Sequence, residues 1–459
     1  MVTKIKSSFR DPSGFLFQEK GVLYRNIDKS YRKNYNKMLS SGILEEFWKN
    51  NLLVKHKEVG IKKQNSSTFK TISPEIVPFI SYPYEWCFSQ LKDAALLTLK
   101  MQRMALSFEM TLKDASAFNI QFKNGKPIFI DTLSFEVYEN GSPWIAYKQF
   151  CQHFLAPLTL MCYQDLRLNQ LLKTFIDGIP LDLASSLLPK KSYLKFSLLT
   201  HIHLHAKTQK HYADKPTKSR IARTVKMSKN AHLALISSLE NAVKTLKPAK
   251  IKTEWGNYYK KTNYSDNSFL QKRNVIKKFL EKSGKPRNVW DLGSNTGSFS
   301  RIASNMGIST VSFDIDPIAV EKNYLLTKKQ RESDILPLVL DLTNPSPSIG
   351  WAHEERISLQ KRANSDLIMA LALIHHLSIS NNLPFENVAE YFSKLAKNLI
   401  IEFVPKSDSN VKRLLSTRED VFPKYNERYF EKAFSKYYKI KDKTKLKDSE
   451  RTLYLMTKL

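Results

Sequence analysis

A glycine-rich stretch in the second half of the chain combines residue types that can hold an adenosine-bearing ligand. Residues 289–297 read Val-Trp-Asp-Leu-Gly-Ser-Asn-Thr-Gly, and the residues of interest are Asp291, Gly293, Asn295 and Gly297. Glycines let the backbone approach a ligand closely. A second apolar run, residues 309–313, ends in Asp314. A carboxylate at that place can accept hydrogen bonds from both hydroxyls of a ribose.

Two features favour S-adenosylmethionine over a dinucleotide as this ligand. The turn has the form Gly-x-x-x-Gly and lacks the third glycine of the Gly-x-Gly-x-x-Gly pattern, so the backbone cradle for a pyrophosphate is missing. A third apolar run, residues 336–340, ends in Asp341. The amino group of an adenine could donate a hydrogen bond to this side chain. The series of runs therefore predicts a site for a nucleoside that carries no pyrophosphate.

The elements that must position these side chains are the strands of an open α/β sheet. A fourth apolar run, residues 366–373, leads to His375 and His376, and a fifth, residues 398–404, carries Glu402. The carboxyl ends of parallel strands lie at one edge of such a sheet, where ligands bind. We therefore expect the polar residues that end the five runs to lie along one edge.

In these residues the chain resembles the class I S-adenosylmethionine-dependent methyltransferases. The resemblance covers residues 251–459 and implies a seven-stranded Rossmann-like domain whose last strands, including residues 452–456, form an antiparallel hairpin. It also implies that the two glycines line the methionine part of the cofactor, that Asp314 binds the ribose and that Asp341 lies near the adenine. Asn295 replaces the middle glycine of the commoner pattern. The predicted cofactor-binding residues are Asp291, Gly293, Asn295, Gly297, Asp314 and Asp341.

The whole chain is also similar to a bacterial group related to nodulation-type methyltransferases, which fixes no substrate. The sulfonium methyl is electrophilic, so transfer needs a positioned nucleophile and exclusion of water more than covalent help. His375 and His376 are the predicted catalytic residues, because one imidazole could accept a proton from the acceptor at neutral pH. The alternative is that they cap a connection or pack on the cofactor. Aromatic residues at 255–264 are either a flap over the cofactor or packing for the first helix.

The first half of the chain contains an acid, an amide and a second acid, namely Asp114, Asn119 and Asp131. Their spacing resembles that of the catalytic loop and the metal-binding acid of protein kinases and aminoglycoside phosphotransferases. By that resemblance Asp114 would orient a hydroxyl, while Asn119 and Asp131 would hold magnesium. The flanking residues depart from the pattern, and we find no glycine-rich phosphate loop and no strand lysine. An active site, a kinase-like lobe without catalysis and a coincidental hairpin all stay open. No other metal site is predicted.

Composition indicates an ordinary globular protein with a strongly basic surface. Of 459 residues, 42% are hydrophobic and 25% charged, which argues against disorder. No apolar run approaches the ~20 residues of a membrane span, and the first residues lack the apolar core of a signal peptide, so we expect a cytoplasmic protein without membrane insertion. The net charge is +30, and residues 207–287 hold 21 lysines and arginines against five acids, an excess of 16. Such a segment can attract phosphates.

These observations predict three parts: an N-terminal α+β domain over residues 1–205 that recognises the acceptor and is kinase-like in one reading, a basic helical connector over 206–250, and a methyltransferase domain of α/β class over 251–459. The predicted function is S-adenosylmethionine-dependent methylation of a small-molecule or glycan-like acceptor. Three alternatives are an RNA methyltransferase that uses residues 207–287, a non-catalytic cofactor-binding scaffold, and a bifunctional kinase-like methyltransferase.

Overall fold

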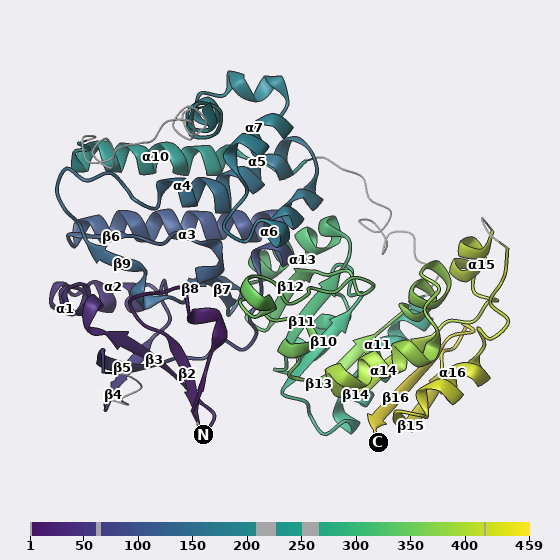
Figure 1. The fold of residues 1–459 in the computed structure, drawn as a ribbon. Helices are drawn as coiled ribbons and strands as arrows, with labels where there is room; N and C mark the ends of the chain where they lie inside the picture. Colours follow the sequence, from purple (N-terminus) through teal and green to yellow (C-terminus); the bar gives the residue numbers. More distant parts are fainter. Residues whose placement is uncertain (1, 61–65, 208–225, 250–265, 417–418) are drawn as a thin grey trace. The chain divides into compact units, whose positions relative to one another are not determined.

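The computed structural model describes residues 2–60, 66–207, 226–249, 266–416 and 419–459. The chain divides into two compact units, each of which is described by itself (Figure 1). The first unit comprises Met1–Ile251 together with Ser348–Arg356, and the second comprises Lys252–Pro347 and Ile357–Leu459. A short segment that follows the third strand of the second unit in the chain therefore belongs to the first unit.

The first unit begins with a five-stranded antiparallel sheet. Its strands, in spatial order, are β1 (Val2–Lys4), β2 (Leu16–Glu19), β3 (Val22–Asp28), β5 (Thr68–Pro74) and β4 (His56–Val59). Helices α1 (Arg32–Ser41) and α2 (Ile43–Lys49) connect β3 to β4. The sequence of residues 1–85, in which turn residues precede short apolar runs, predicts short strands and turns, and this prediction is wrong for these two helices. Apolar residues at helical spacing form their buried faces: Tyr35, Met38, Ile43, Leu44 and Phe47.

A long helix, α3 (Phe88–Ser107), leads into two small strand pairs. Strands β7 (Ile120–Lys123) and β8 (Lys126–Phe129) form the predicted hairpin, and its turn residues Asn124 and Gly125 have φ of 51° and 70°. These positive φ values explain the Asn-Gly pair, which suits a two-residue turn. The second pair, β6 (Met110–Leu112) with β9 (Phe135–Val137), joins chain segments on either side of the hairpin.

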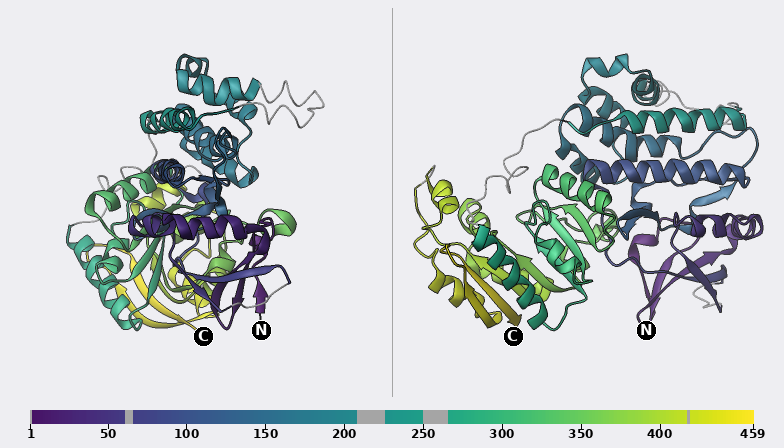
Figure 2. Two further views of the ribbon diagram at one scale, coloured as in Figure 1. Left: turned by 90° about the vertical axis from the view of Figure 1, so that its left-hand side faces the viewer. Right: turned by 180° about the vertical axis from the view of Figure 1, so that it is seen from behind.

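The rest of the first unit is helical. The helices are α4 (Tyr147–Phe150), α5 (Ala156–Tyr163), α6 (Leu171–Thr174), α7 (Leu181–Leu187), α8 (Phe196–Leu198) and α10 (Lys229–Thr245). The last of these lies in the segment that we expected to be a basic connector. It runs beside α3, where Arg103 Nη2 lies 3.0 Å from Glu240 Oε2 and Gln102 contacts His232 (Figures 1 and 2).

The second unit is built on a seven-stranded sheet. Its strands, in spatial order, are β12 (Ile335–Val339), β11 (Ser309–Asp314), β10 (Asn288–Leu292), β13 (Ser365–Ala370), β14 (Ala396–Phe403), β16 (Thr452–Lys458) and β15 (Tyr438–Lys445). The first five strands are parallel and β16 is antiparallel to both of its neighbours. The predicted α/β sheet of seven strands with a final antiparallel hairpin is confirmed.

Helices cover both faces of this sheet (Figure 1). They are α11 (Asp266–Lys282), α12 (Ser300–Ser304), α13 (Pro317–Gln330), α14 (Phe385–Leu395), α15 (Ser409–Leu415) and α16 (Glu427–Phe434). Ile400 packs with α11 and α12 in one apolar cluster, whereas Phe403 packs on Phe385 and Phe430 of α14 and α16. Alternate residues of a strand point to opposite faces, so β14 is buried on both sides. This explains its nearly continuous apolar sequence.

Candidate cofactor-binding site

The glycine-rich turn follows β10, the strand at which the order of the sheet reverses. Strand β11 lies on one side of β10 and β13 on the other, which is the position where open α/β sheets bind ligands. Gly293 and Gly297 have φ of 76° and 77°, and Asn295 has φ of 51°. A Cβ atom on Gly297 would lie 2.6 Å from the side chain of Asn323. The turn therefore requires glycine at 297 for both its conformation and its surroundings.

Arg301 fixes the turn from the side of the following helix. Its Nη1 donates to the carbonyl oxygens of Thr296 and Gly297 at 2.9 and 3.1 Å, and to Asn323 Oδ1 at 2.9 Å. The same guanidinium pairs with Glu332 at 2.7 Å. These contacts order the backbone before any ligand binds, which lowers the entropic cost of binding.

Asp314, at the end of β11, lies against the turn. Its Oδ2 accepts from Asn295 N at 2.7 Å and its Oδ1 accepts from Asp316 N at 2.8 Å. Burial raises the pKa of Asp314 to about 6, although both backbone hydrogen bonds act to lower it. Each carboxylate oxygen keeps a lone pair that could accept a ribose hydroxyl. Asp291 is deeper: its carboxylate accepts from Ser300 Oγ at 2.6 Å, and burial raises its pKa to about 7.

One buried side chain of the turn has an unsatisfied hydrogen-bonding group, which fits the binding of a polar ligand. Ser294 is 4% exposed, and its Oγ is buried without a hydrogen-bond partner. A buried hydroxyl without a partner is costly, and a bound ligand with a polar group could satisfy it. Asp341 lies beyond β12, half-buried, and its Oδ1 accepts from the backbone N and the Oγ1 of Thr343 at 2.8 and 2.7 Å. Together these groups line the edge where β10, β11 and β12 end.

The two predicted catalytic histidines follow β13 at the same edge. His375 is 1% exposed, and its Nδ1 is buried without a partner. Burial lowers the pKa of His375 well below its ordinary value, and the neighbouring cations act in the same direction. Burial, with Arg413 and Arg451, lowers the pKa of His376 to about 4. Both imidazoles are therefore neutral near pH 7 and are weak bases.

Comparison with known proteins identifies the family. No known family model matches the chain. The nodulation protein NoeA of Rhizobium meliloti (strain 1021) is 34% identical over 465 residues, which cover 98% of this chain and 95% of NoeA. The chain belongs to the NoeA family. The prediction of a relationship to bacterial nodulation proteins is confirmed.

Among solved structures, the N-methyltransferase NodS from Bradyrhizobium japonicum WM9 has a TM-score of 0.31 and 13% identity, covering 42% of this chain and 98% of NodS. Magnesium protoporphyrin IX methyltransferase (ChlM) from Synechocystis PCC 6803, with bound SAH, has a TM-score of 0.30 and 16% identity, covering 42% and 84%. Scores this low support no inference about function. The seven-stranded sheet with its antiparallel hairpin is the fold that the resemblance to class I methyltransferases implies.

Sequence reasoning missed a buried ionic cluster beside this site. Lys272 of α11 and Glu402 of β14 are 1% and 0% exposed in their side chains, and their Nζ and Oε2 atoms are 2.6 Å apart. Arg451 lies 3.9 Å from Glu402 Oε1 and makes two contacts with Asp408, at 2.7 and 3.1 Å. Glu402 itself could have revealed this cluster, because it lies in an otherwise apolar strand. A buried carboxylate requires a cationic partner.

The other predicted residues have varied outcomes. The aromatic residues at 255–264 and nine of the 21 lysines and arginines at 207–287 lie outside the described residues. His201 and His203 bond to hydroxyl groups in this NoeA-family chain: Tyr147 Oη lies 2.8 Å from His201 Nδ1, and Ser192 Oγ lies 2.9 Å from His203 Nε2. No helix in the described part of the chain combines the length and apolar character that a membrane span requires.

The segment Ser348–Arg356, which the sequence did not single out, packs within the first unit. Arg10 Nε donates to Glu355 at 2.9 Å, and the guanidinium of Arg356 lies 4.3 Å from the centre of the Phe118 ring. Phe118 directly precedes Asn119 of the kinase-like set. That set is assembled in space by the strand pairs β6–β9 and β7–β8.

Proposed function

We propose that this NoeA-family methyltransferase transfers the methyl group of S-adenosylmethionine to a small-molecule or glycan-like acceptor. The observation that carries the proposal is the ordered turn of residues 293–297 beside Asp314, at the point where the sheet order reverses.

The residues at the edge of the sheet would bind the cofactor and orient the acceptor, and they need not form a covalent bond with either. The cofactor, when bound, supplies an electrophilic methyl group. Asp314 would accept hydrogen bonds from the ribose hydroxyls, and the turn of residues 293–297 would lie against the methionine part. Rate acceleration would then come from holding the acceptor in line with the methyl group and excluding water.

The low basicity of the histidines narrows the chemistry of the acceptor. A group with a pKa near 4, like His376, takes up a proton poorly at neutral pH. His375 and His376 would therefore accept or donate hydrogen bonds that orient the acceptor. An amine that reaches the site unprotonated needs no base, whereas a hydroxyl acceptor needs a proton acceptor elsewhere in the complex. We propose an unprotonated amine, in a small molecule or a glycan, as the preferred acceptor group.

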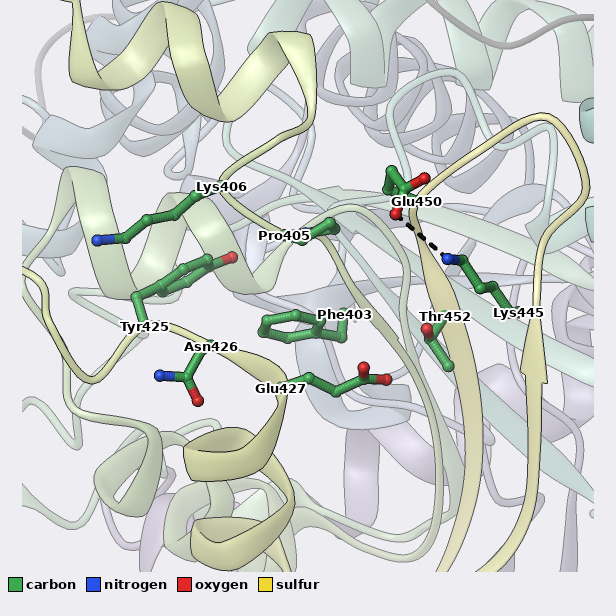
Figure 3. Close-up of a pocket in the computed structure, with 9 residues that line it drawn as sticks. All are labelled: Phe403, Pro405, Lys406, Tyr425, Asn426, Glu427, Lys445, Glu450 and Thr452. Carbon is green, nitrogen blue, oxygen red and sulfur yellow. Dashed lines mark hydrogen bonds and ion pairs between the residues drawn. The ribbon is translucent and has the colours of Figure 1, made fainter.

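A pocket of about 280 Å³ at the same edge of the sheet is the proposed acceptor site (Figure 3). Phe403 and Thr452 pair at the ends of β14 and β16 and form part of its wall. Figure 3 shows the rings of Phe403 and Tyr425 beside Asn426, whose side chain caps α16 by accepting from Tyr429 N at 3.1 Å. The full lining consists of Phe403, Pro405, Lys406, Tyr425, Asn426, Glu427, Lys445, Glu450 and Thr452.

This lining suits a neutral, hydroxyl-rich ligand. Apolar walls with a few polar groups are typical of small-molecule sites, and the side chains here carry both signs of charge. Lys445 pairs with Glu450 at 3.2 Å across the mouth, so neither sign dominates there. Strand β14 is two positions from β10 in the sheet, which corresponds to about 10 Å between strand axes. An acceptor of sugar size could span that separation.

The test is transfer of labelled methyl groups from the cofactor by the full-length protein into fractionated cell extract. We expect label in the small-molecule or oligosaccharide fraction, and loss of both cofactor binding and transfer in Asp314→Ala. The matched control is Asp334→Ala, which removes an exposed carboxylate at the other end of the sheet. Label in RNA would favour the RNA methyltransferase that uses the basic segment. Cofactor binding without transfer to any fraction would favour the scaffold.

A further inference from the structure

The first unit brings together the acid, amide and acid that the sequence singled out. Asn119 Nδ2 donates to Ser134 Oγ at 3.3 Å, and Ser134 Oγ donates in turn to Asp131. The Asp114 carboxylate accepts a hydrogen bond from the Asn119 side chain and another from Gln149 Nε2 at 2.8 Å. Two carboxylates and an amide thus lie close together in the first unit.

A cation from the sheet completes this group. Arg25 lies on β3, is 8% exposed, and its Nη1 lies 2.9 Å from Asp131 Oδ1. Its Nη2 pairs with Asp11, and its Nε is buried without a hydrogen-bond partner. The sequence showed no strand lysine of the kind that pairs with phosphates in kinases, where it lies on the third strand. The structure places an arginine on the third strand instead.

The connection between β1 and β2 lies beside the same group. Ser13 Oγ accepts from Lys113 Nζ at 2.8 Å, and Lys113 directly precedes Asp114. Gly14 has φ of 154°, and a Cβ atom on it would overlap the carbonyl oxygen of Asn26, the neighbour of Arg25. The connection therefore lies close against β3 and holds Lys113, a second cation beside the group, through Ser13.

We propose that the first unit binds a magnesium-complexed nucleoside triphosphate at this group. Asp131 and Asn119 would hold the metal ion, and Arg25 would bind the phosphate oxygens. Magnesium is usually held by one or two carboxylates together with substrate phosphates, and not by a cage of protein ligands. Among the described residues, no group of three or more His, Cys, Asp or Glu side chains is placed to hold a metal by itself.

Arg25 explains how the group exists without a ligand. A buried carboxylate requires a compensating charge, and the guanidinium supplies it to Asp131. A bound metal ion would take over that role, and the planar fork of the guanidinium would then be available to the phosphate oxygens. The unpartnered Nε then gains an acceptor.

The experiment measures binding of a non-hydrolysable ATP analogue, adenylyl imidodiphosphate, to the full-length protein by calorimetry. We expect binding with magnesium and at least tenfold weaker binding with EDTA. Asp131→Asn should remove the effect of magnesium, and Arg25→Met should weaken binding at least tenfold in either condition. The matched control is Asp165→Asn, because Asp165 also caps a short helix and also pairs with an arginine, Arg167, at 2.7 Å.

Two measurements separate loss of binding from loss of folding. Circular dichroism and S-adenosylmethionine affinity are measured on every variant, and Arg25→Lys, which keeps the charge, should retain more affinity than Arg25→Met. The proposal fails if the wild-type protein does not bind the analogue at millimolar concentration, or if Asp131→Asn and Arg25→Met bind like the control. Either failure with intact S-adenosylmethionine binding leaves the proposed methyl transfer untouched.

Discussion

The proposed ribose contact makes the affinity for S-adenosylmethionine depend on pH. Burial raises the pKa of Asp314 to about 6, so the free protein carries a proton on this side chain below that pH. Ribose hydroxyls donate hydrogen bonds most strongly to the ionised carboxylate. Binding must therefore displace the proton, and the affinity should fall as the pH falls through 6.

The size of the effect follows from the shift. A pKa raised from 3.8 to about 6 corresponds to about 3 kcal/mol between the two protonation states. If the bound ligand returns the pKa to its ordinary range, the dissociation constant rises about tenfold for each pH unit below 6. The sign for folding is the reverse: the raised pKa stabilises the free protein below pH 4, and this contribution is lost as the pH rises through 6.

The assay is titration calorimetry between pH 5 and 7.5 in two buffers of different ionisation enthalpy, which counts the protons released. We expect proton release near pH 6 in the wild type and weak, pH-independent binding in Asp314→Asn. His376, with a pKa of about 4, stays neutral over this range, and Asp291→Asn removes the other buried acid that titrates there. A wild-type dissociation constant that does not change between pH 5 and 7.5 would refute the reasoning, as would the same pH profile in Asp314→Asn.

Two further predictions concern the framework of the site. Gly297→Ala should lower the thermal stability and the cofactor affinity more than Gly307→Ala does. Both glycines have φ near 76°, which costs about 1 kcal/mol for alanine, but only a Cβ atom at 297 would contact neighbouring side chains. Equal losses in the two variants would contradict the steric argument. Glu402→Gln should destabilise the second unit by about 3–5 kcal/mol, because it leaves Lys272 buried without a carboxylate. The double variant that also carries Lys272→Met should recover most of this stability. Hydrogen exchange of the β14 amides measures the loss, and strictly additive losses would argue against an interaction between the two side chains.

The sheet and the glycine-rich turn could be predicted from the sequence because their signals are local. Each of the five parallel strands is a short apolar run that carries or precedes a polar residue near one edge of the sheet. The Asn124-Gly125 hairpin has the same local character. In contrast, α1 and α2 were missed because their helical spacing is interrupted at Gly42, whose left-handed conformation separates two short helices.

The remaining parts depend on contacts between distant residues, which one sequence does not encode locally. A buried glutamate or arginine in an apolar strand indicates that an oppositely charged partner exists, but it does not identify that partner. Glu402 could have been assigned any of the 73 lysines and arginines, and the fold selects Lys272. Arg25 was not predicted as a site residue for the same reason. It belongs to the site only because it pairs with Asp131, which lies in the turn after β8. The kinase-like reading of the sequence lacked a phosphate-binding cation, and only the pairing of β3 with that turn supplies one. Buried charges in strands thus indicate the position of a site, and only the tertiary structure shows which residues form it.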